Sequence, residues 1–234
     1  MQNLAVAEVA AVLAEPARAA MCLAMIDGRA WTVGELATVA DIAPSTGSEH
    51  VAKLVDAGFV ETLKQGRHRY VRIADPKVAD LIEQLAEHAE HRPHTSLKAS
   101  LRARRLAVAR TCYDHLAGKL GVALRQGMIA TGLLDTSAGL AITVAGQQVL
   151  RELGVRPGTR TGRPLLRDCL DWTERREHLG GATAAALLDR SLEAGWLRRG
   201  EDRSIRIDPA ARTPLATLGV DIDAVADSPT SSVR

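Results

Sequence analysis

The order of structure-specifying residues between positions 32 and 58 constrains the fold of this chain more than any other feature. Thr32-Val33-Gly34-Glu35 has the form of a capping box, in which a Thr hydroxyl and a Glu carboxylate each satisfy a free backbone N–H, so a short helix is expected over residues 33–40. Pro44 suits the first position of a second helix, because its φ is fixed near the helical value and its missing N–H costs nothing there. That helix is expected to run to Asp56 and to stop at Gly58.

A hairpin and another helix are predicted to follow this pair. Residues 59–63 and 70–73 are rich in β-forming residues, and the basic segment between them predicts the tip of a hairpin. A helix is expected over residues 78–89, with apolar residues on one face. Upstream, residues 4–26 have helical spacing interrupted by Glu15-Pro16, which predicts two helices or one broken helix. The order helix, turn, helix, hairpin, helix is that of a winged helix.

Residues 35–60 resemble the recognition region of the ArsR/SmtB family of transcriptional regulators. Ser48-Glu49-His50-Val51 is similar to the Ser-x-His-Leu core of that region, and Ala57-Gly58 closes it. The resemblance covers residues 5–90 and implies a winged helix-turn-helix in this part of the chain. Two residues depart from the pattern: Ala43 stands where a Ser-type cap is usual, and Gly47 lies inside the helix, where it costs up to about 1 kcal/mol in propensity.

The resemblance implies that the second helix enters the major groove of DNA, with polar side chains available to base edges and phosphates. These side chains belong to Ser45, Thr46, Ser48, Glu49, His50 and Lys53. The hairpin tip would contact neighbouring phosphates through Lys64, Arg67, His68 and Arg69. The alternative is a solvated basic loop. Because the formal net charge is only +2, the interpretation depends on where the basic residues lie and not on their total.

The composition favours a helical, intracellular protein. Aromatic residues make up only 3% of the chain, so its cores must be built from Ala, Leu and Val, and the predicted fold class is mainly α with small β-hairpin wings. No apolar run reaches the length of a membrane span, and the N-terminus lacks a signal core, so a cytoplasmic location is expected. The three cysteines, Cys22, Cys112 and Cys169, are widely spaced, which predicts free thiols in a reducing compartment.

Residues 88–96 are polar and contain Pro93, which indicates a domain boundary. We predict a winged-helix DNA-binding domain over residues 1–92, a C-terminal regulatory domain over residues 97–225 and a flexible tail over residues 226–234. Three histidines lie at the boundary, namely His88, His91 and His94. The first two could share a helix face and bind zinc or nickel, but a solvated linker is favoured because the proline breaks any helix before the third.

The second half contains a degenerate repeat with a Cys-x-Asp-ring motif at the start of each copy. The motifs are Cys112-Tyr113-Asp114-His115 and Cys169-Leu170-Asp171-Trp172. Each is followed by a run of small residues, a glycine and a hairpin-like stretch, which is expected over residues 127–143 in the first copy and 195–208 in the second. The same order occurs in the first domain, so the C-terminal domain is predicted to consist of two winged-helix-like repeats. Apolar residues from Leu97 to Leu120 also predict one long helix, with Arg110 on its charged face.

The repeat motifs supply the chemistry of a metal or effector site. Cys112 and His115 are three residues apart, which on one helix lets a thiolate and an imidazole bind the same metal ion. Cys169 and His178 are nine residues apart and would diverge on an unbroken helix. The predicted site between the two repeats consists of Cys112, His115 and Cys169, completed by His178 or by an aspartate, either Asp114 or Asp171, as a ligand or as an acceptor for histidine.

The alternative is that both cysteines fill gaps in separate helix contacts as small hydrophobes. The cofactor is open: a divalent metal ion is one candidate, and a thiol that reacts with oxidants or soft metalloids is another effector chemistry. Metalloid sensors of the resembled family carry a Cys-x-Cys pair near the recognition helix, and no cysteine occurs here between Cys22 and Cys112.

These features together predict a sequence-specific transcriptional regulator, a dimeric repressor of a double-stranded operator that an unidentified effector releases. In the alternative, the protein is a metal- or thiol-based sensor whose C-terminal domain is mainly a module that binds a protein partner or a small molecule. An enzyme is not expected, because the chain has no Gly-rich phosphate loop, no Gly-x-Ser-x-Gly and no His-Glu-x-x-His.

Overall fold

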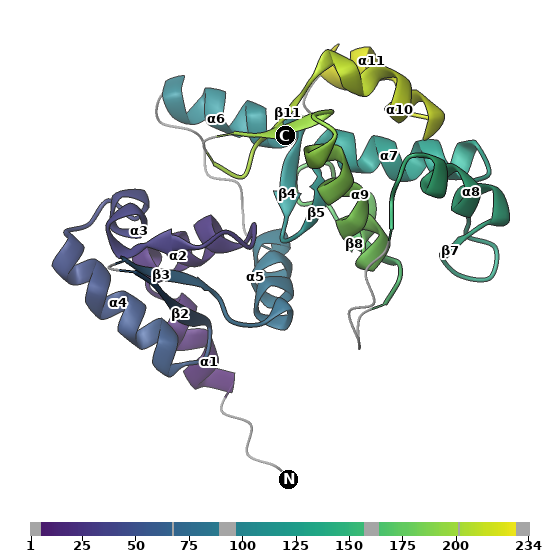
Figure 1. Ribbon diagram of the computed structural model, residues 1–234. Coiled ribbons are helices and arrows are strands. Elements are labelled where there is room, and N and C mark those ends of the chain that lie inside the picture. Colours follow the sequence, from purple (N-terminus) through teal and green to yellow (C-terminus); the bar gives the residue numbers. More distant parts are fainter. Residues whose placement is uncertain (1–5, 67, 89–96, 157–163, 201, 228–234) are drawn as a thin grey trace, which may run out of the picture. The chain divides into compact units, whose positions relative to one another are not determined.

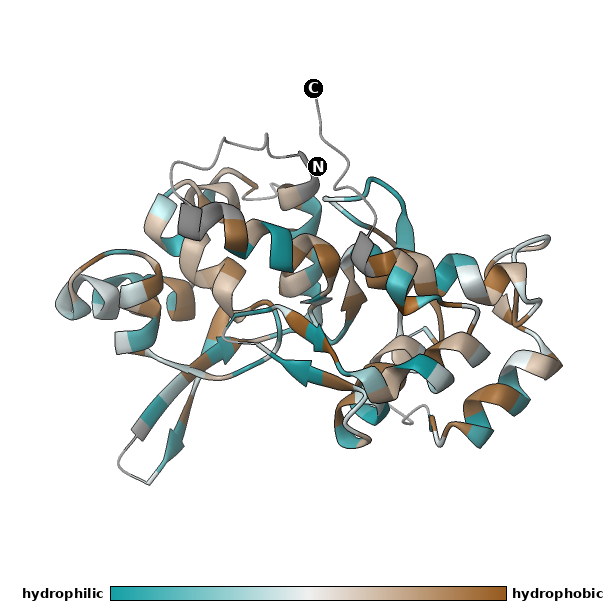
Figure 2. Cartoon of the chain, turned by 90° about the horizontal axis from the view of Figure 1, so that it is seen from above, coloured by the Kyte–Doolittle hydropathy of each residue, from teal (hydrophilic) through white to brown (hydrophobic). Residues whose placement is uncertain are grey.

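The computed structural model describes residues 6–66, 68–88, 97–156, 164–200 and 202–227 of the chain. Its contacts divide the chain into two compact units, residues 1–88 and residues 89–234, which we call the N-terminal unit and the C-terminal unit (Figure 1). Hydrophobic and hydrophilic residues are mixed along the helices of both units, as expected for helices that bury one face (Figure 2). Of the tail predicted over residues 226–234, residues 226 and 227 form the end of a helix, and residues 228–234 lie outside the described residues.

The N-terminal unit is a winged helix-turn-helix, as the sequence predicted. Its helices are α1 (Val6–Leu13), α2 (Pro16–Met25), α3 (Val33–Val39), α4 (Pro44–Asp56) and α5 (Pro76–His88). Its strands β1 (Trp31–Thr32), β2 (Val60–Gln65) and β3 (His68–Ile73) form an antiparallel sheet in the order β1-β3-β2. The break at Glu15-Pro16 is present between α1 and α2, and the β2-β3 hairpin is the wing.

Local signals set the ends of α3 and α4. Thr32 Oγ1 accepts the N–H of Glu35 at 3.3 Å, and Glu35 Oε2 accepts the N–H of Thr32 at 2.7 Å, which completes the capping box. Pro44 is the first residue of α4, and Gly58, with a φ of 71°, follows its end. Ala43 gives α4 no side-chain cap.

Gly47 allows α3 and α4 to approach closely. It lies on the buried face of α4 with Val51 and Leu54, and a Cβ built on it would lie only 2.9 Å from the Cβ of Ala37. The propensity that glycine loses inside a helix is therefore offset here by close packing. The core beneath these helices includes Cys22, which has no exposed surface. Burial raises the pKa of this thiol to about 12, so it remains protonated.

Among the described residues, the C-terminal unit starts with α6 (Leu97–Val108). The same order of hairpin, helix, hairpin and helix then occurs twice. The first copy is the hairpin of β4 (Arg110–Cys112) and β5 (His115–Ala117), helix α7 (Gly118–Ala130), the hairpin of β6 (Leu134–Asp135) and β7 (Ala141–Ile142), and α8 (Val144–Glu152). The second is the hairpin of β8 (Arg167–Leu170) and β9 (Glu177–Gly180), helix α9 (Ala182–Glu193), the hairpin of β10 (Leu197–Arg199) and β11 (Ile205–Ile207), a 3-10 turn (Pro209–Ala211) and α10 (Arg212–Thr217). Helix α11 (Ile222–Asp227) follows.

The predicted long helix starting at Leu97 is wrong. Helix α6 ends at Val108, residues 110–117 form the β4-β5 hairpin, and α7 starts at Gly118. Every residue of β4 and β5 is buried, so these strands lack the alternation of polar and apolar residues that distinguishes a strand from one face of a helix. Arg110, expected on the charged face of that helix, has no exposed surface.

The first hairpin-like stretch after the repeat motif also lies later in the chain than predicted. Residues 127–129 belong to α7, which is followed by Gly132 at a φ of 71°, and Leu134 then pairs with Ile142. The same order of helix, glycine and hairpin occurs in the second copy, where Gly195 precedes β10.

The core of the C-terminal unit joins the two copies. Leu120 and Met128 of α7 lie in one buried cluster with Leu187 and Leu188 of α9. Within the described residues, none of the helices has both the length and the apolar character needed to cross a lipid bilayer.

Candidate functional site

The outer face of α4 presents most of the residues predicted to read DNA. Four of the six are exposed, namely Ser45, Ser48, Glu49 and Lys53. The other two, Thr46 and His50, are half-buried. They flank the packed side of the helix, which contains Gly47 and Val51. Ser48 Oγ donates to the carbonyl oxygen of Pro44 at 3.0 Å, which leaves its lone pairs available to an outside donor.

The wing places two positive charges on one face of its hairpin. Lys64 and Arg69 are both exposed and are direct cross-strand partners on β2 and β3. Like charges placed opposite each other destabilise a hairpin. This pair therefore does not stabilise the wing itself, but it could bind an anion outside the unit. Of the other two predicted tip residues, Arg67 and the side chain of His68 lie outside the described residues.

The histidines at the domain boundary stay a prediction. His91 and His94 lie outside the described residues, and only the backbone of His88, at the end of α5, is described.

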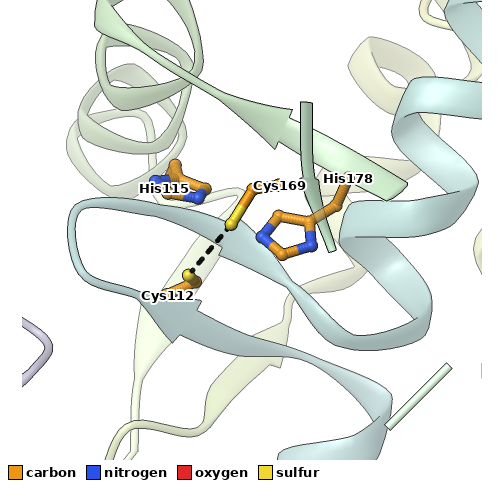
Figure 3. A group of neighbouring side chains, drawn as sticks. All are labelled: Cys112, His115, Cys169 and His178. Atoms are coloured by element: carbon orange, nitrogen blue, oxygen red, sulfur yellow. Dashed lines mark hydrogen bonds between the residues drawn. The ribbon is translucent and has the colours of Figure 1, made fainter. Parts of the chain in front are cut away.

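A second candidate site is the Cys-His cluster, which consists of Cys112, His115, Cys169 and His178 (Figure 3). Cys112 on β4 pairs across the hairpin with His115 on β5, and Cys169 on β8 pairs with His178 on β9. The first hairpin of each copy thus supplies one cysteine and one histidine. The structure brings together the residues that the repeat singled out. The expected helix is wrong, however, because both Cys-His pairs lie on facing strands.

The cluster is compact and nearly closed to solvent. Candidate ligand atoms of the four side chains all lie within 4.8 Å of one another. The Sγ atoms of Cys112 and Cys169 are 3.7 Å apart, and Figure 3 shows the Cys169 side chain between the two imidazole rings. His115 and His178 are 0% and 1% exposed, Cys112 is buried, and Cys169 is half-buried.

Each imidazole has one nitrogen near a carboxylate and another without a partner. His115 Nδ1 lies 3.4 Å from Asp114 Oδ1, and His178 Nδ1 lies 3.5 Å from Asp171 Oδ2. The Nε2 atoms of both histidines, and Nδ1 of His178 as well, are buried and make no hydrogen bond within the part of the chain that the structure describes. Since buried polar atoms in proteins nearly always have a partner, the two Nε2 atoms mark a place for a further group.

The surroundings favour the thiolate form of Cys169. The hydrogen bond with Cys112 and the nearby imidazoles of His115 and His178 hold the pKa of Cys169 well below that of an ordinary thiol, although burial opposes ionisation. Burial alone would lower the pKa of His115, but its contacts with Asp114 and Cys169 outweigh burial and raise it. The thiolate is the form of cysteine that binds metals and reacts with electrophiles.

A buried ion pair supports the cluster from one side. Arg110 and Asp171 both have fully buried side chains, and Arg110 Nη2 lies 3.0 Å from Asp171 Oδ2. The guanidinium group of Arg110 also lies 4.5 Å from the ring centre of Trp172. Although burial opposes ionisation of Asp171, the charge of Arg110 and hydrogen bonds from Thr173 hold its pKa well below the usual range. Asp171 therefore remains an anion beside His178.

Sequence reasoning missed the roles of Arg110 and Gly118. The N–H of Gly118 donates to Asp171 Oδ2 at 2.6 Å, and a Cβ on this glycine would lie 2.7 Å from the carbonyl oxygen of Ala107. The available signal was a glycine directly after the first hairpin of each copy: Gly118 and Gly181 both have positive φ, at 75° and 96°. No comparable signal indicated a buried arginine at position 110.

Residues 13–62 match the family model described as a helix-turn-helix domain. The chain is 39% identical over 214 residues to the HTH-type transcriptional regulator YdfF of Bacillus subtilis (strain 168), a match that spans 90% of this chain and 95% of the relative. It is also 37% identical over 73 residues to a biofilm growth-associated repressor of Agrobacterium fabrum, which covers 31% of this chain and 62% of that protein.

Two solved structures are similar to the N-terminal part of the chain. One is the homodimeric winged helix-turn-helix domain of a possible ArsR-family regulator from Mycobacterium bovis, with 29% identity, a TM-score of 0.33, and coverage of 39% of this chain and 87% of that one. The other is the transcriptional repressor BigR from Xylella fastidiosa, with 25% identity, a TM-score of 0.34, and coverage of 38% and 89%.

The chain belongs to the HTH-type transcriptional regulators, and its N-terminal unit is the ArsR/SmtB-like winged helix that the sequence resembles. It is therefore a transcriptional regulator with a DNA-binding helix-turn-helix.

Proposed function

We propose that this regulator is a sequence-specific repressor that binds a double-stranded operator as a homodimer and is released by an effector acting on the C-terminal unit. The exposed polar face of α4, next to the helix-turn-helix contact with α3, is the observation that carries the DNA-binding part of this proposal. Regulation, and not catalysis, is the activity proposed for the whole chain.

Helix α4 is proposed to lie in the major groove with Ser45 and Ser48 directed at base edges. Short hydroxyl side chains near a helix N-terminus can approach bases closely, and Lys53 one turn or more further on can reach a phosphate. The facing pair of Lys64 and Arg69 gives the wing a place on the adjacent backbone.

Exposed apolar residues at both ends of the N-terminal unit support the homodimer. Helix α1 has no buried residue, and its Val6 and Val9 are 66% and 45% exposed. Leu85 of α5 is 48% exposed. Large apolar side chains gain free energy when a second copy covers them, and two-fold symmetry then predicts a pseudo-palindromic operator.

The C-terminal unit is proposed to be the regulatory part, built of two winged-helix-like repeats. Each copy has the order hairpin, helix, hairpin, helix, and the helix, glycine and hairpin within it repeat the order found at α4, Gly58 and the wing. An effector that binds this unit differently in the DNA-bound and free states would change DNA affinity.

The test is binding of the purified full chain to fluorescent duplexes from its own promoter and to random duplexes, together with sedimentation of the free protein. We expect a dimer that prefers the promoter duplex by roughly a thousandfold or more at physiological salt. Ser48→Ala should reduce this preference, whereas Glu152→Ala, at an exposed position of α8 outside both α4 and the proposed dimer surface, should preserve it. A monomer with equal affinity for both duplexes would contradict the proposal.

A further inference from the structure

We propose that the Cys-His cluster is a zinc site, in which Cys112, His115, Cys169 and His178 bind one Zn²⁺ ion and join the two copies of the C-terminal unit. This inference concerns how that unit is held together, and it stands whether or not the protein is a repressor.

The donor set is that of a structural zinc site. Two thiols and two imidazoles form the Cys₂His₂ combination, and N and S ligands in a tetrahedron select Zn²⁺ over the hard cations Mg²⁺ and Ca²⁺. Each ligand pair comes from facing positions on a hairpin, Cys112 with His115 and Cys169 with His178. Residues at facing positions of a hairpin have neighbouring side chains, so the two ligands of a pair stay close together whatever the conformation of the connecting loop.

The spacing of the sulfurs fits a shared metal ion. Two sulfurs on one tetrahedral Zn²⁺, with Zn–S bonds of about 2.3 Å, lie about 3.8 Å apart. The Sγ atoms of Cys112 and Cys169 are 3.7 Å apart, far beyond the roughly 2.05 Å of a disulfide. The other candidate ligand atoms lie within 4.8 Å, so small rotations of the imidazole rings complete the tetrahedron.

The buried nitrogens provide an independent reason for a metal. A thiol pair alone could be explained by an S–H···S hydrogen bond, but that bond leaves the Nε2 atoms of His115 and His178 buried without a hydrogen-bond partner among the described residues. A buried polar group without a partner destabilises the folded state, because it has lost its hydrogen bonds to water. A Zn²⁺ ion bound through both Nε2 atoms removes this cost.

The carboxylates nearby are placed as outer partners of the ligands. Asp114 and Asp171 lie 3.4 and 3.5 Å from the Nδ1 atoms of His115 and His178, which leaves Nε2 of each ring for the metal. Such carboxylate-histidine-zinc arrangements fix the tautomer and orientation of the imidazole.

Charge and access indicate that the ion is structural. The two thiolates balance the charge of Zn²⁺, so the buried site would be neutral. The adjacent charges of Arg110 and Asp171 cancel each other and add no net charge to it. Four protein ligands fill a tetrahedral shell and leave no position for water or substrate. The ion therefore crosslinks β4-β5 to β8-β9, elements separated by some fifty residues of chain.

The test measures metal in the full chain purified from zinc-supplemented cells with a reductant that does not chelate. We expect about one Zn²⁺ per chain in the wild type and less than roughly a tenth of that in Cys112→Ser or Cys169→Ser. Cys22→Ala is the matched control, because Cys22 is buried in the other unit, and it should keep full zinc. His178→Cys, which preserves four ligands as Cys₃His, should retain zinc where His178→Ala loses it.

If the serine variants fail to fold, cobalt substitution of the wild type tests whether the Cys-His cluster binds a metal ion. Co²⁺ added to chelator-treated protein should give the visible bands of tetrahedral coordination and the near-ultraviolet band of thiolate ligands, and Zn²⁺ should remove both. Wild-type protein with under about a tenth of a zinc ion per chain and no such bands would overturn the zinc site. Zinc bound in full by a protein that ignores its promoter would instead overturn only the proposed function.

Discussion

The two units differ in the sequence distance between the residues that define them. In the N-terminal unit the capping box joins Thr32 and Glu35, three residues apart. In the C-terminal unit Asp171 accepts the N–H of Gly118, which is 53 residues away, and Cys112 meets Cys169 across 57 residues. Features built from neighbours can be recognised in a sequence, whereas features built across fifty residues depend on the packing of the whole unit.

The two units also differ in where they place ion pairs. Arg72 and Glu61 pair across the wing with side chains 47% and 42% exposed, while Arg110 and Asp171 pair at full burial. An exposed pair gains little, because water screens it. A buried pair depends on both partners, because removing one leaves the other charged and desolvated.

The largest effect is expected from breaking the buried pair. Arg110→Met should destabilise the C-terminal unit by about 3 to 5 kcal/mol, whereas Arg72→Met should cost the N-terminal unit less than about 1 kcal/mol. Hydrogen exchange measured by mass spectrometry, which separates the two units, is the appropriate method. Equal losses of protection in the two variants would contradict the expectation that the buried ion pair contributes more to stability than the exposed one.

A smaller difference is expected between two glycines of nearly equal φ. Gly118 and Gly58 have φ of 75° and 71°, but a Cβ on Gly118 would lie 2.7 Å from a carbonyl oxygen, whereas one on Gly58 would have no atom of the described residues within 4 Å. Gly58→Ala should cost only the left-handed backbone strain, about 1 to 2 kcal/mol, and Gly118→Ala clearly more. Denaturant midpoints of the two variants measure the difference. A cost for Gly118→Ala no greater than that for Gly58→Ala would show that the close contact relaxes freely.

Removing the capping hydroxyl tests how local the N-terminal signals are. Thr32→Ala should destabilise α3 by about 1 kcal/mol, and Thr32→Ser, which keeps the hydroxyl, should restore most of it. The reduction in protection should be confined to the N-terminal unit. Loss of protection in α7 or α9 as well would mean that the units are not independent.

The smallest effect on stability is expected at the wing. Lys64→Ala should leave the free energy of unfolding within about 0.5 kcal/mol of the wild type, or slightly increase it because a like-charged pair is removed. Its affinity for any duplex should fall, and the slope of log K against log salt should decrease by about 1. Lys77→Ala, an exposed lysine of α5, serves as the control. The same salt slope in both variants would argue against a phosphate contact at the wing.

The sequence-based predictions were accurate for local features of the N-terminal unit and less accurate for the C-terminal unit, whose features depend on long-range packing. Helix α4 was predicted with both ends correct, since Pro44 and Gly58 specify them by backbone chemistry alone. The hairpin at residues 110–117 was predicted as helix, because its two strands of three residues are buried on both faces and carry no alternation. Cys112, His115 and Cys169 could nonetheless be selected from the repeated Cys-x-Asp-ring motif, since that choice needs only residue type and position, whereas His178 lies outside the motif and the fourth ligand stayed open.

The sequence by itself determined the winged helix-turn-helix, and it supplied the residues proposed to contact DNA and the cysteines and histidines of the C-terminal half as candidates. Only the tertiary structure decided that Cys112 faces His115 across a hairpin, that Cys169 and His178 join them, and that Arg110 is buried against Asp171. The physical reason is that caps, prolines and glycines act on the backbone within one turn of themselves. Burial and coordination instead depend on which distant segments pack together, and short local patterns do not encode that choice.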